Sequence, residues 1–340
     1  MNFEHGGDIY SFAKKLDCNI SDIVDLSSNI NFIKPNLDID FNSLNISSYP
    51  NYNSLKDAIS NNYNISIDNF ELYNGASVAI YSLLKRLKYQ DIVLYAPIYL
   101  EYKKFASLNG YNIKYIDRFN MINEDIPFQS LVVFVNPSTP DGAFYNIDTL
   151  INRWIEREAT IIIDESFLDF TPYKSAIEYI NRYDKIYIIK SMTKFYSSAG
   201  IRVGLVISNI ENIIDINRDE PLWKISEFDS KYLEYALKDK KFANISRDIT
   251  QKNRELLIKI LKKYREIEKI YPSTTNYILI KLRYINAIEF QNRLIPYKIM
   301  VRDCWNFDFL DNNFIRVAIK DIESINSLEN ALNNILSLRE

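Results

Sequence analysis

Residues 190–204, KSMTKFYSSAGIRVG, are the most informative part of the sequence for the fold. A strand-like run, KIYIIKS, leads into a turn that carries Lys194, and Arg202 follows eight positions later beside glycines. A lysine that condenses with an aldehyde must be held on rigid backbone and be partly desolvated, so that its amine is neutral. A nearby cation can then hold the phosphate of a bound cofactor. The two residues are candidates for a Schiff-base lysine and its phosphate anchor.

Neighbouring segments strengthen this interpretation. Taken alone, Lys194 and Arg202 could simply be solvated charges after a strand. However, Asp164 closes the run TIIID and Asn136 closes the run SLVVFVN, and open α/β sheets bind ligands at the carboxyl ends of their strands. The turn in YNGASVAIYSLL, residues 73–84, precedes a helical pattern and offers backbone N–H groups to an anion. We expect these three strand ends to converge on one site.

Composition argues against several other classes of function. The 340 residues include 41 basic and 44 acidic side chains, with a net charge of -3, so the basic excess of a nucleic-acid-binding protein is missing. Two distant cysteines and a single histidine, His5, favour a reducing compartment and argue against a metal site. The chain has no apolar run of roughly 18 residues and no signal pattern. We therefore expect a cytoplasmic protein that binds no metal, nucleic acid or membrane.

Apolar runs alternate with helix-length amphipathic segments through the first two thirds of the chain. This alternation is typical of parallel strands joined by right-handed crossovers. The predicted strands are FELYN, DIVLYA, NIKYID, SLVVFVN, TIIIDE, KIYIIKS and RVGLVIS. The helices expected between them cover roughly residues 76–88, 98–109, 146–157 and 173–183. The pattern predicts an α/β domain with a mostly parallel, seven-stranded sheet.

The pattern changes after Asn209. Residues 226–268 carry long helical patterns, followed by a strand at TNYILIKL, a short helix, strands at KIMVR and NFIRVAI, and a last helix from Asp321. This order predicts a smaller α+β domain, completed by the N-terminal segment. We expect a large domain over residues 46–218 and a small domain formed by residues 1–45 and 219–340.

Ordered signatures along nearly the whole chain resemble one known family. They are HGGDI (5–9), SSNIN (27–31), YPNY (49–52), NGAS (74–77), NPSTPDG (136–142), DESFLDF (164–170), SMTKFYSSAGIRVG (191–204), MVRDC (300–304) and IRVAIK (315–320). In this order they resemble the fold-type-I pyridoxal-phosphate enzymes of the aminotransferase superfamily. The resemblance is to the branch of histidinol-phosphate aminotransferase and threonine-phosphate decarboxylase, and is closest to the latter. It implies pyridoxal 5'-phosphate as the cofactor.

The resemblance also implies roles for individual residues. Lys194 would form a Schiff base with the cofactor, Asp164 would pair with its pyridine nitrogen, and Asn136 would bond its phenolic oxygen. Tyr99 would stack on the ring, and Tyr49 would reach the cofactor phosphate of a neighbouring subunit, so a homodimer with shared sites is implied. The residues implied at the phosphate are Gly75, Ala76, Ser77, Ser191 and Arg202. A carboxylate at Asp164 would keep the pyridine nitrogen protonated, which strengthens the ring as an electron sink.

Simpler structural explanations exist for some of these residues. Asp164 could cap a helix, Asn136 could only end a strand before a proline turn, and Tyr99 could pack in the core as one of 25 tyrosines. The turn at residues 136–142 also departs from the family pattern N-P-x-N-P-x-G, because Thr139 replaces the middle Asn.

Features of the resemblance favour a decarboxylase over an aminotransferase. HGGDI opens the chain as in the decarboxylase, and Phe167 replaces a tyrosine that most aminotransferases of this branch have. SMTKFY and VRDC also match the decarboxylase. By resemblance, His5 and Arg302 would bind the substrate phosphate, and Arg316 and Asn29 its carboxylate, since the guanidinium fork meets two oxygens at once. Alternatively, His5 could cap a helix, and Arg302 could lie on the surface.

The expected activity is decarboxylation of O-phospho-L-threonine or O-phospho-L-serine, which in the family feeds synthesis of the cobamide nucleotide loop. The alternative is an aminotransferase acting on a phosphorylated substrate such as histidinol phosphate. A non-catalytic binding module is a third alternative, but it would not require Lys194, Asp164, Asn136 and Arg202 together. No signature separates threonine from serine, because one methyl group is worth only about 1–3 kcal/mol of discrimination.

Overall fold

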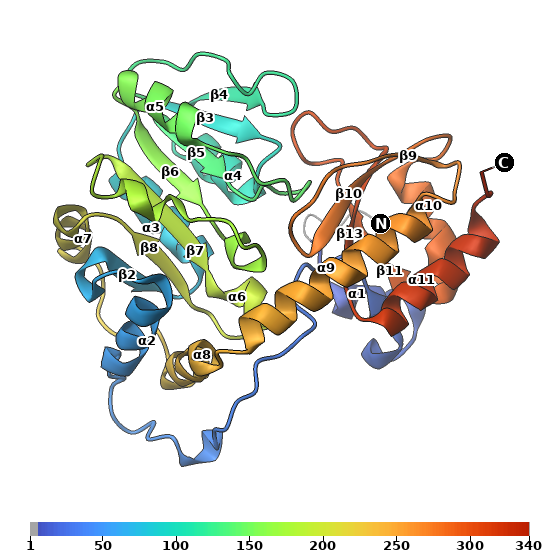
Figure 1. Cartoon of the computed structure of the whole chain (residues 1–340), viewed down its shortest axis with the longest axis horizontal. Helices are drawn as coiled ribbons and strands as arrows, with labels where there is room; N and C mark the ends of the chain where they lie inside the picture. The colour runs from blue at the N-terminus through green and yellow to red at the C-terminus, as the bar shows by residue number, and fades with distance from the viewer. Residues whose placement is uncertain (1–5, 340) are drawn as a thin grey trace.

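A seven-stranded sheet forms the larger part of the molecule in the computed structural model, which describes residues 6–339 (Figure 1). Its strands are β2 (Phe70–Tyr73), β3 (Asp91–Ala96), β4 (Asn112–Asp117), β5 (Leu131–Val135), β6 (Thr160–Asp164), β7 (Ile186–Ser191) and β8 (Gly204–Ile207). Their order across the sheet is β2-β8-β7-β6-β5-β3-β4. β8 runs antiparallel to β2 and β7, and every other pair of neighbouring strands in the sheet is parallel. The predicted α/β fold with a mostly parallel, seven-stranded sheet is confirmed.

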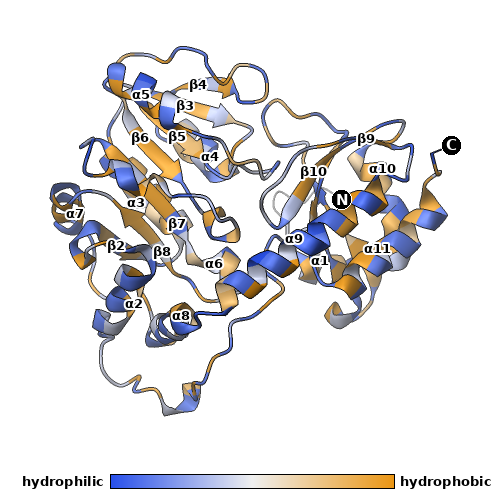
Figure 2. Cartoon of the chain, in the orientation of Figure 1, coloured by the Kyte–Doolittle hydropathy of each residue, from blue (hydrophilic) through white to orange (hydrophobic). Residues whose placement is uncertain are grey.

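Strands β5, β6 and β7 are buried along their whole length. Helices cover both faces of a parallel sheet, so its central strands have no solvated face and consist of unbroken apolar runs. The hydrophobic core accordingly divides into two clusters, one containing Val132 and Ile161 and the other containing Val133 and Ile162. Figure 2 shows these strands largely in orange. This rigid sheet carries Asp164 and Ser191 at its carboxyl edge.

Helices surround this sheet, and together they form what we call the large-sheet part. They are α2 (Asn53–Tyr63), α3 (Ala76–Arg86), α4 (Leu100–Leu108), α5 (Asp148–Glu156), α6 (Met192–Phe195), α7 (Ile210–Asn217) and α8 (Glu227–Lys238). The helix predicted at residues 173–183 is wrong, because only a 3-10 helix, η5 (Ala176–Tyr179), forms there. The Ser175 hydroxyl and the Ala176 N–H donate to the buried Glu165 carboxylate at 2.6 Å each, which holds the chain against the sheet in a tight turn.

A four-stranded antiparallel sheet, in the order β12-β13-β10-β9, is the centre of the small-sheet part. Its strands are β9 (Ile267–Ile270), β10 (Tyr277–Leu282), β12 (Arg302–Asp303) and β13 (Phe314–Ala318), and its helices are α9 (Phe242–Leu261), α10 (Ala287–Leu294) and α11 (Ile322–Ile335). β9 was not predicted. The single strand predicted at KIMVR is divided between β12 and β11 (Ile299–Met300), which pairs with β1 (Val24–Asp25) of the N-terminal segment.

The remaining elements are short. They are α1 (Ile9–Leu16) and the 3-10 helices η1 (Ile20–Asp22), η2 (Phe41–Ser43), η3 (Ile67–Asn69), η4 (Leu168–Phe170) and η6 (Ile295–Tyr297). Helix α9 runs from the large-sheet part to the small-sheet part (Figure 1) and contacts both η4 and α11. Residues of α8, including Leu233 and Leu237, join the core of the large sheet, whereas Leu257 of α9 joins that of the small sheet. The predicted division at residue 218 stays a prediction.

Candidate active site

A cavity of about 210 Å³ lies where the carboxyl edge of the large sheet meets β12 and β13. Many residues singled out in the sequence line it: Asn29, Ala76, Ser77, Tyr99, Asp164, Ser191, Lys194, Arg202, Arg302 and Arg316. Within residues 6–339, no group of three His, Cys, Asp or Glu side chains is placed to hold a metal ion. No helix in that range is long and apolar enough to cross a membrane.

Lys194 lies on α6, directly after β7, and its half-buried side chain forms part of the cavity wall. Burial, together with the nearby Arg202 and Arg316 guanidinium groups, lowers the pKa of its amine to about 8, and Asp164 opposes this shift. The backbone is fixed as well, because the Lys194 carbonyl accepts a hydrogen bond from the Asn31 N–H at 3.0 Å. A substantial fraction of the amine is therefore neutral near physiological pH, as a nucleophile requires.

The Asp164 carboxylate is anchored at both oxygens. Oδ1 accepts from the Ser166 N–H at 2.9 Å, and Oδ2 accepts from the Tyr102 hydroxyl at 2.7 Å. Burial raises the pKa of Asp164, while these hydrogen bonds and the Lys194 amine favour the charged form. Such a carboxylate is best stabilised by a cationic partner in the cavity, and a protonated ring nitrogen would supply one.

The N-terminus of α3 forms an anion cradle beside Arg202. Gly75 precedes the helix with φ +84°, and a Cβ there would lie 2.5 Å from the Arg202 guanidinium. A Cβ on Gly204 would lie 2.4 Å from the Ala76 nitrogen. These two glycines let the guanidinium and the helix N-terminus approach each other closely, and Ser77 and Ser191 lie in the same cavity wall. Together with Lys194 and Asp164, this cradle fits a cofactor that combines an aldehyde, a ring nitrogen and a phosphate.

Arg302 and Arg316 lie opposite, on the small sheet. They are directly paired across β12 and β13, and both are buried. Arg316 donates to the Thr139 hydroxyl at 3.3 Å and to the Ser27 carbonyl at 3.1 Å, and its Nε is buried without a hydrogen-bond partner among the described residues. Arg302 donates to the Asn306 side-chain oxygen at 2.8 Å. A buried guanidinium group such as that of Arg316 suits an anionic ligand.

Three other predicted residues do not line this cavity. Asn136 is buried, but its side-chain oxygen accepts from the Tyr145 N–H and its nitrogen donates to the Tyr145 carbonyl, at 2.9 and 3.0 Å. Gly75 lies against the Arg202 guanidinium but does not itself line the cavity. Tyr49 is 74% exposed and stacks on Trp223, with ring centroids 4.1 Å apart. The roles given to Asn136 and Tyr49 stay predictions, and His5 lies outside the described residues.

Other residues of the site had not been identified from the sequence. Thr139 lines the cavity three positions after Asn136, and Tyr102 holds Asp164 from the first turn of α4. Asn306 and Phe307 line the cavity next to Arg302. The substitution at Thr139 in the NPSTPDG turn was the one available signal; the other three have no local sequence pattern that marks them.

Comparisons with known proteins give one consistent family. The family described as aminotransferase class I and II matches residues 22–333. The adenosylcobalamin biosynthesis bifunctional protein CobDQ of Leptospira interrogans is 31% identical over 98% of this chain, which spans 41% of that protein's length. Threonine-phosphate decarboxylase of Salmonella typhimurium is 24% identical over 99% of this chain and 98% of its own length. The solved histidinol-phosphate aminotransferase of Clostridium acetobutylicum has a TM-score of 0.81 and 29% identity, over 91% of this chain and 98% of its own.

Proposed function

The chain belongs to the aminotransferase class I and II family of pyridoxal 5'-phosphate enzymes, and on this basis we propose that it decarboxylates O-phospho-L-threonine or O-phospho-L-serine. The observation that carries the proposal is the pair of buried arginines, Arg302 and Arg316, facing Lys194 across one cavity. The similarity to the CobDQ protein and to the Salmonella decarboxylase supports it. Because CobDQ is an adenosylcobalamin biosynthesis protein, we further propose a role in synthesis of the cobamide nucleotide loop.

The large-sheet part provides the groups that would hold the cofactor. When bound, pyridoxal 5'-phosphate supplies a ring that accepts the electron pair left on the substrate's alpha carbon. Asp164 would hold the ring nitrogen, and Arg202 with the N-terminus of α3 would hold the phosphate. Lys194, with a pKa lowered to about 8, can take up and return a proton, so its Nζ is the group best placed to protonate the alpha carbon.

The two arginines account for the choice of substrate. Side chains directly opposite on antiparallel strands have Cβ atoms about 4.5–5.5 Å apart. In a phosphorylated hydroxy-amino acid, the carboxylate and the phosphate are also separated by only a few bonds. Arg316 would hold the carboxylate and Arg302 the phosphate. Because the bond that breaks is the one held perpendicular to the cofactor ring, a fixed carboxylate lets the protein select decarboxylation.

A second candidate is an aminotransferase acting on a phosphorylated substrate. The likeness to the solved Clostridium enzyme supports it. Histidinol phosphate has a phosphate but no carboxylate, so it would occupy only one arginine as an anion. The dicarboxylate 2-oxoglutarate could occupy both.

We propose that the working unit is a homodimer with its sites at the subunit interface. Tyr49 and Trp223 stack on each other at the surface. Leu222, 73% exposed, directly precedes Trp223, and Ile46, 68% exposed, lies three positions before Tyr49. An exposed apolar cluster of this kind usually marks an interaction site. The cytoplasmic location stays a prediction.

Product analysis separates the candidates. The pyridoxal-phosphate-loaded protein is incubated with O-phospho-L-threonine or O-phospho-L-serine, with and without 2-oxoglutarate. The decarboxylase forms the phosphorylated amino alcohol and carbon dioxide without any keto acid. Turnover that occurs only with 2-oxoglutarate would support the aminotransferase instead.

A further inference from the structure

The loop between β12 and β13 crosses from the small-sheet part toward the large-sheet part. Asn306 and Phe307 of this loop line the cavity, and the next residue, Asp308, contacts Lys103 on α4. Nζ of Lys103 lies 2.5 Å from Oδ1 of Asp308. Helix α4 begins at the opposite cavity wall, where Tyr99 and Leu100 line the same cavity. The ion pair therefore joins the two walls, from residues 205 positions apart in the chain.

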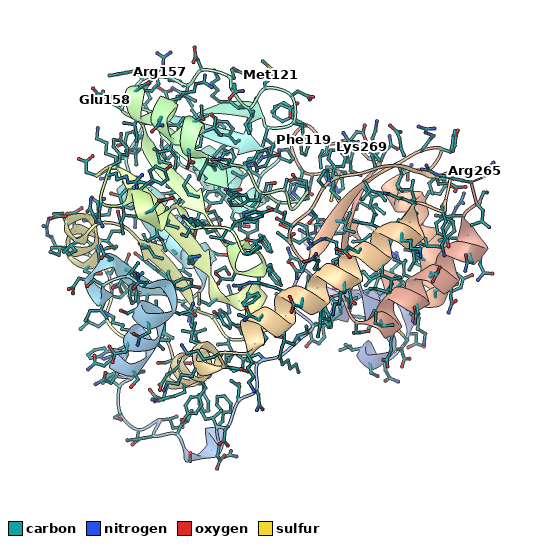
Figure 3. The ribbon with its side chains drawn as sticks, in the orientation of Figure 1. Phe119, Met121, Arg157, Glu158, Arg265 and Lys269 are labelled. Carbon is teal, nitrogen blue, oxygen red and sulfur yellow. The ribbon has the colours of Figure 1, made fainter. Side chains whose placement is uncertain are left out.

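Residues 304–310, which we call the 304–310 loop, are also held by apolar contacts. Its Cys304, Phe307 and Leu310 pack in one apolar cluster with Phe119 of the large-sheet part. Phe119 contacts Tyr271 with ring centroids 5.2 Å apart, and Lys269 lies over the same Tyr271 ring at 4.3 Å. Figure 3 shows Phe119 and Lys269 where the two parts meet. These apolar contacts hold the 304–310 loop in place, and the ion pair between Asp308 and Lys103 is an additional contact between the loop and α4.

Two residues of the loop contact Arg302. The Arg302 guanidinium donates to Asn306 at 2.8 Å and lies over the Phe307 ring at 5.8 Å. Asn306 and Phe307 are the two residues before Asp308 in the chain, so a contact that holds Asp308 also restricts where they lie. Arg302 is buried, so water would screen a contact between its guanidinium and an anion only weakly, and the orientation of the guanidinium matters for binding.

We propose that the Lys103–Asp308 ion pair is a latch that holds the 304–310 loop across the cavity and so positions Arg302 for the substrate phosphate. The assignment of Arg302 to the phosphate rests on the function proposed above. Lys103 and Asp308 are positioning residues, because they act through Asn306 and Phe307 and neither lines the cavity. The pair is partly exposed, so salt should weaken the latch.

A second ion pair provides a matched control. Lys263 and Glu329 also lie 2.5 Å apart, and their side chains are 45% and 26% exposed, compared with 37% and 23% for Lys103 and Asp308. The control pair joins residues within the small-sheet part, at α11 and after α9. Lys103→Met and Lys263→Met therefore remove the same charge from similar surroundings, and only the first releases the latch.

Trp305, which is 46% exposed, reports the loop position directly. The loaded protein is labelled with 5-fluorotryptophan, its Trp305 resonance is assigned with Trp305→Phe, and inorganic phosphate is titrated in. In Lys103→Met we expect the Trp305 fluorine resonance to move or broaden and its response to phosphate to weaken. The buried Trp154 should not change, and Lys263→Met should match the wild type. Identical Trp305 spectra in Lys103→Met and Lys263→Met would overturn the latch.

Steady-state kinetics provide a second test of the proposal. We expect Lys103→Met to raise KM for O-phospho-L-threonine about 2- to 5-fold, with a smaller change in kcat. The charge swap Lys103→Asp with Asp308→Lys should restore KM, which a fold defect would not allow. An unchanged KM in Lys103→Met, or a swap variant no better than Asp308→Lys alone, counts against the proposal. The fluorine measurement needs no turnover, so an inactive protein would refute the proposed function and leave the latch test intact.

Discussion

The two walls of the cavity hold their charged groups in different ways. On the large-sheet wall, Asp164 ends a fully buried parallel strand and Lys194 follows another. On the small-sheet wall, Arg302 lies on a two-residue strand and is held by a loop. The buried strands of the large-sheet wall hold Asp164 and Lys194 rigidly, as a cofactor site requires. The placement of Arg302 on the small-sheet wall depends on a loop, so this wall can differ between proteins with different substrates. One fold can host different reactions when the groups that contact the substrate change and the cofactor site stays the same.

Removing the amine should give the largest effect. Lys194→Ala should lower turnover by roughly a thousandfold or more. The variant loses both the amine that would bind the cofactor covalently and the group proposed to protonate the alpha carbon. Borohydride reduction should then fail to attach the cofactor covalently, as seen in the intact mass. Lys185→Ala, before the same strand, is the control and should still be labelled. Covalent labelling of Lys194→Ala would show that the large-sheet wall does not work as described.

The carboxylate on the same wall should come next. We expect Asp164→Asn to lower kcat about 100- to 1000-fold while leaving KM nearly unchanged, since the lost charge acts on the reacting state. Tyr102→Phe removes only one hydrogen bond to that carboxylate and should cost far less. Equal losses in the two variants would mean that Asp164 is structural.

On the small-sheet wall the effect should appear in KM. Arg302→Lys keeps the charge but loses the planar fork, so KM for O-phospho-L-threonine should rise about tenfold with kcat little changed. Arg302→Lys should leave the fluorescence of bound cofactor unaltered. A fall in kcat equal to the rise in KM would place Arg302 in the chemical step.

The pH dependence sharpens the contrast further. The pKa of Lys194 is lowered from its ordinary value of 10.5 to about 8, so the neutral amine increases as pH rises toward 8. In protein freed of cofactor, the rate of pyridoxal-phosphate attachment should rise through this range and level off above it. Arg202→Gln removes a neighbouring cation and should move the midpoint to higher pH. A midpoint that stays in place would show that Arg202 has no such influence.

The smallest expected effect concerns the hydrogen bond between Arg316 and Thr139. Thr139 accepts a hydrogen bond from Arg316 at 3.3 Å, a long distance, so its contribution is small. Thr139→Val should raise KM about 2- to 5-fold, and Thr139→Ser should restore it. KM values that do not differ between Val and Ser at this position would show that the hydroxyl does not orient Arg316.

The same contrast explains how much the sequence alone could predict. Asp164 and Lys194 were identified because buried parallel strands produce long apolar runs, and a polar residue that ends such a run is conspicuous. In the turn at residues 136–142, the sequence indicated Asn136 as the site residue, and Thr139 stood out only as a departure from the family pattern. Only side-chain geometry reveals that Thr139 lines the cavity, while Asn136 bonds the Tyr145 backbone.

The sequence predicted less of the small-sheet part. β9 has only four residues, with two exposed side chains in its middle, so it gave little strand signal. The contact between Lys103 and Asp308 joins distant positions and leaves no local pattern. Contacts of this kind depend on how the two parts are placed, which periodicity and motifs do not encode.

A substrate with a labelled carboxyl group shows whether the protein releases that group as carbon dioxide. O-phospho-L-threonine labelled in its carboxyl carbon is given to the loaded protein without any keto acid. We predict one labelled carbon dioxide for each molecule of phosphorylated amino alcohol, and none with Lys194→Ala. Label that remains in a keto-acid product, with the amino group transferred to the cofactor, would contradict the account.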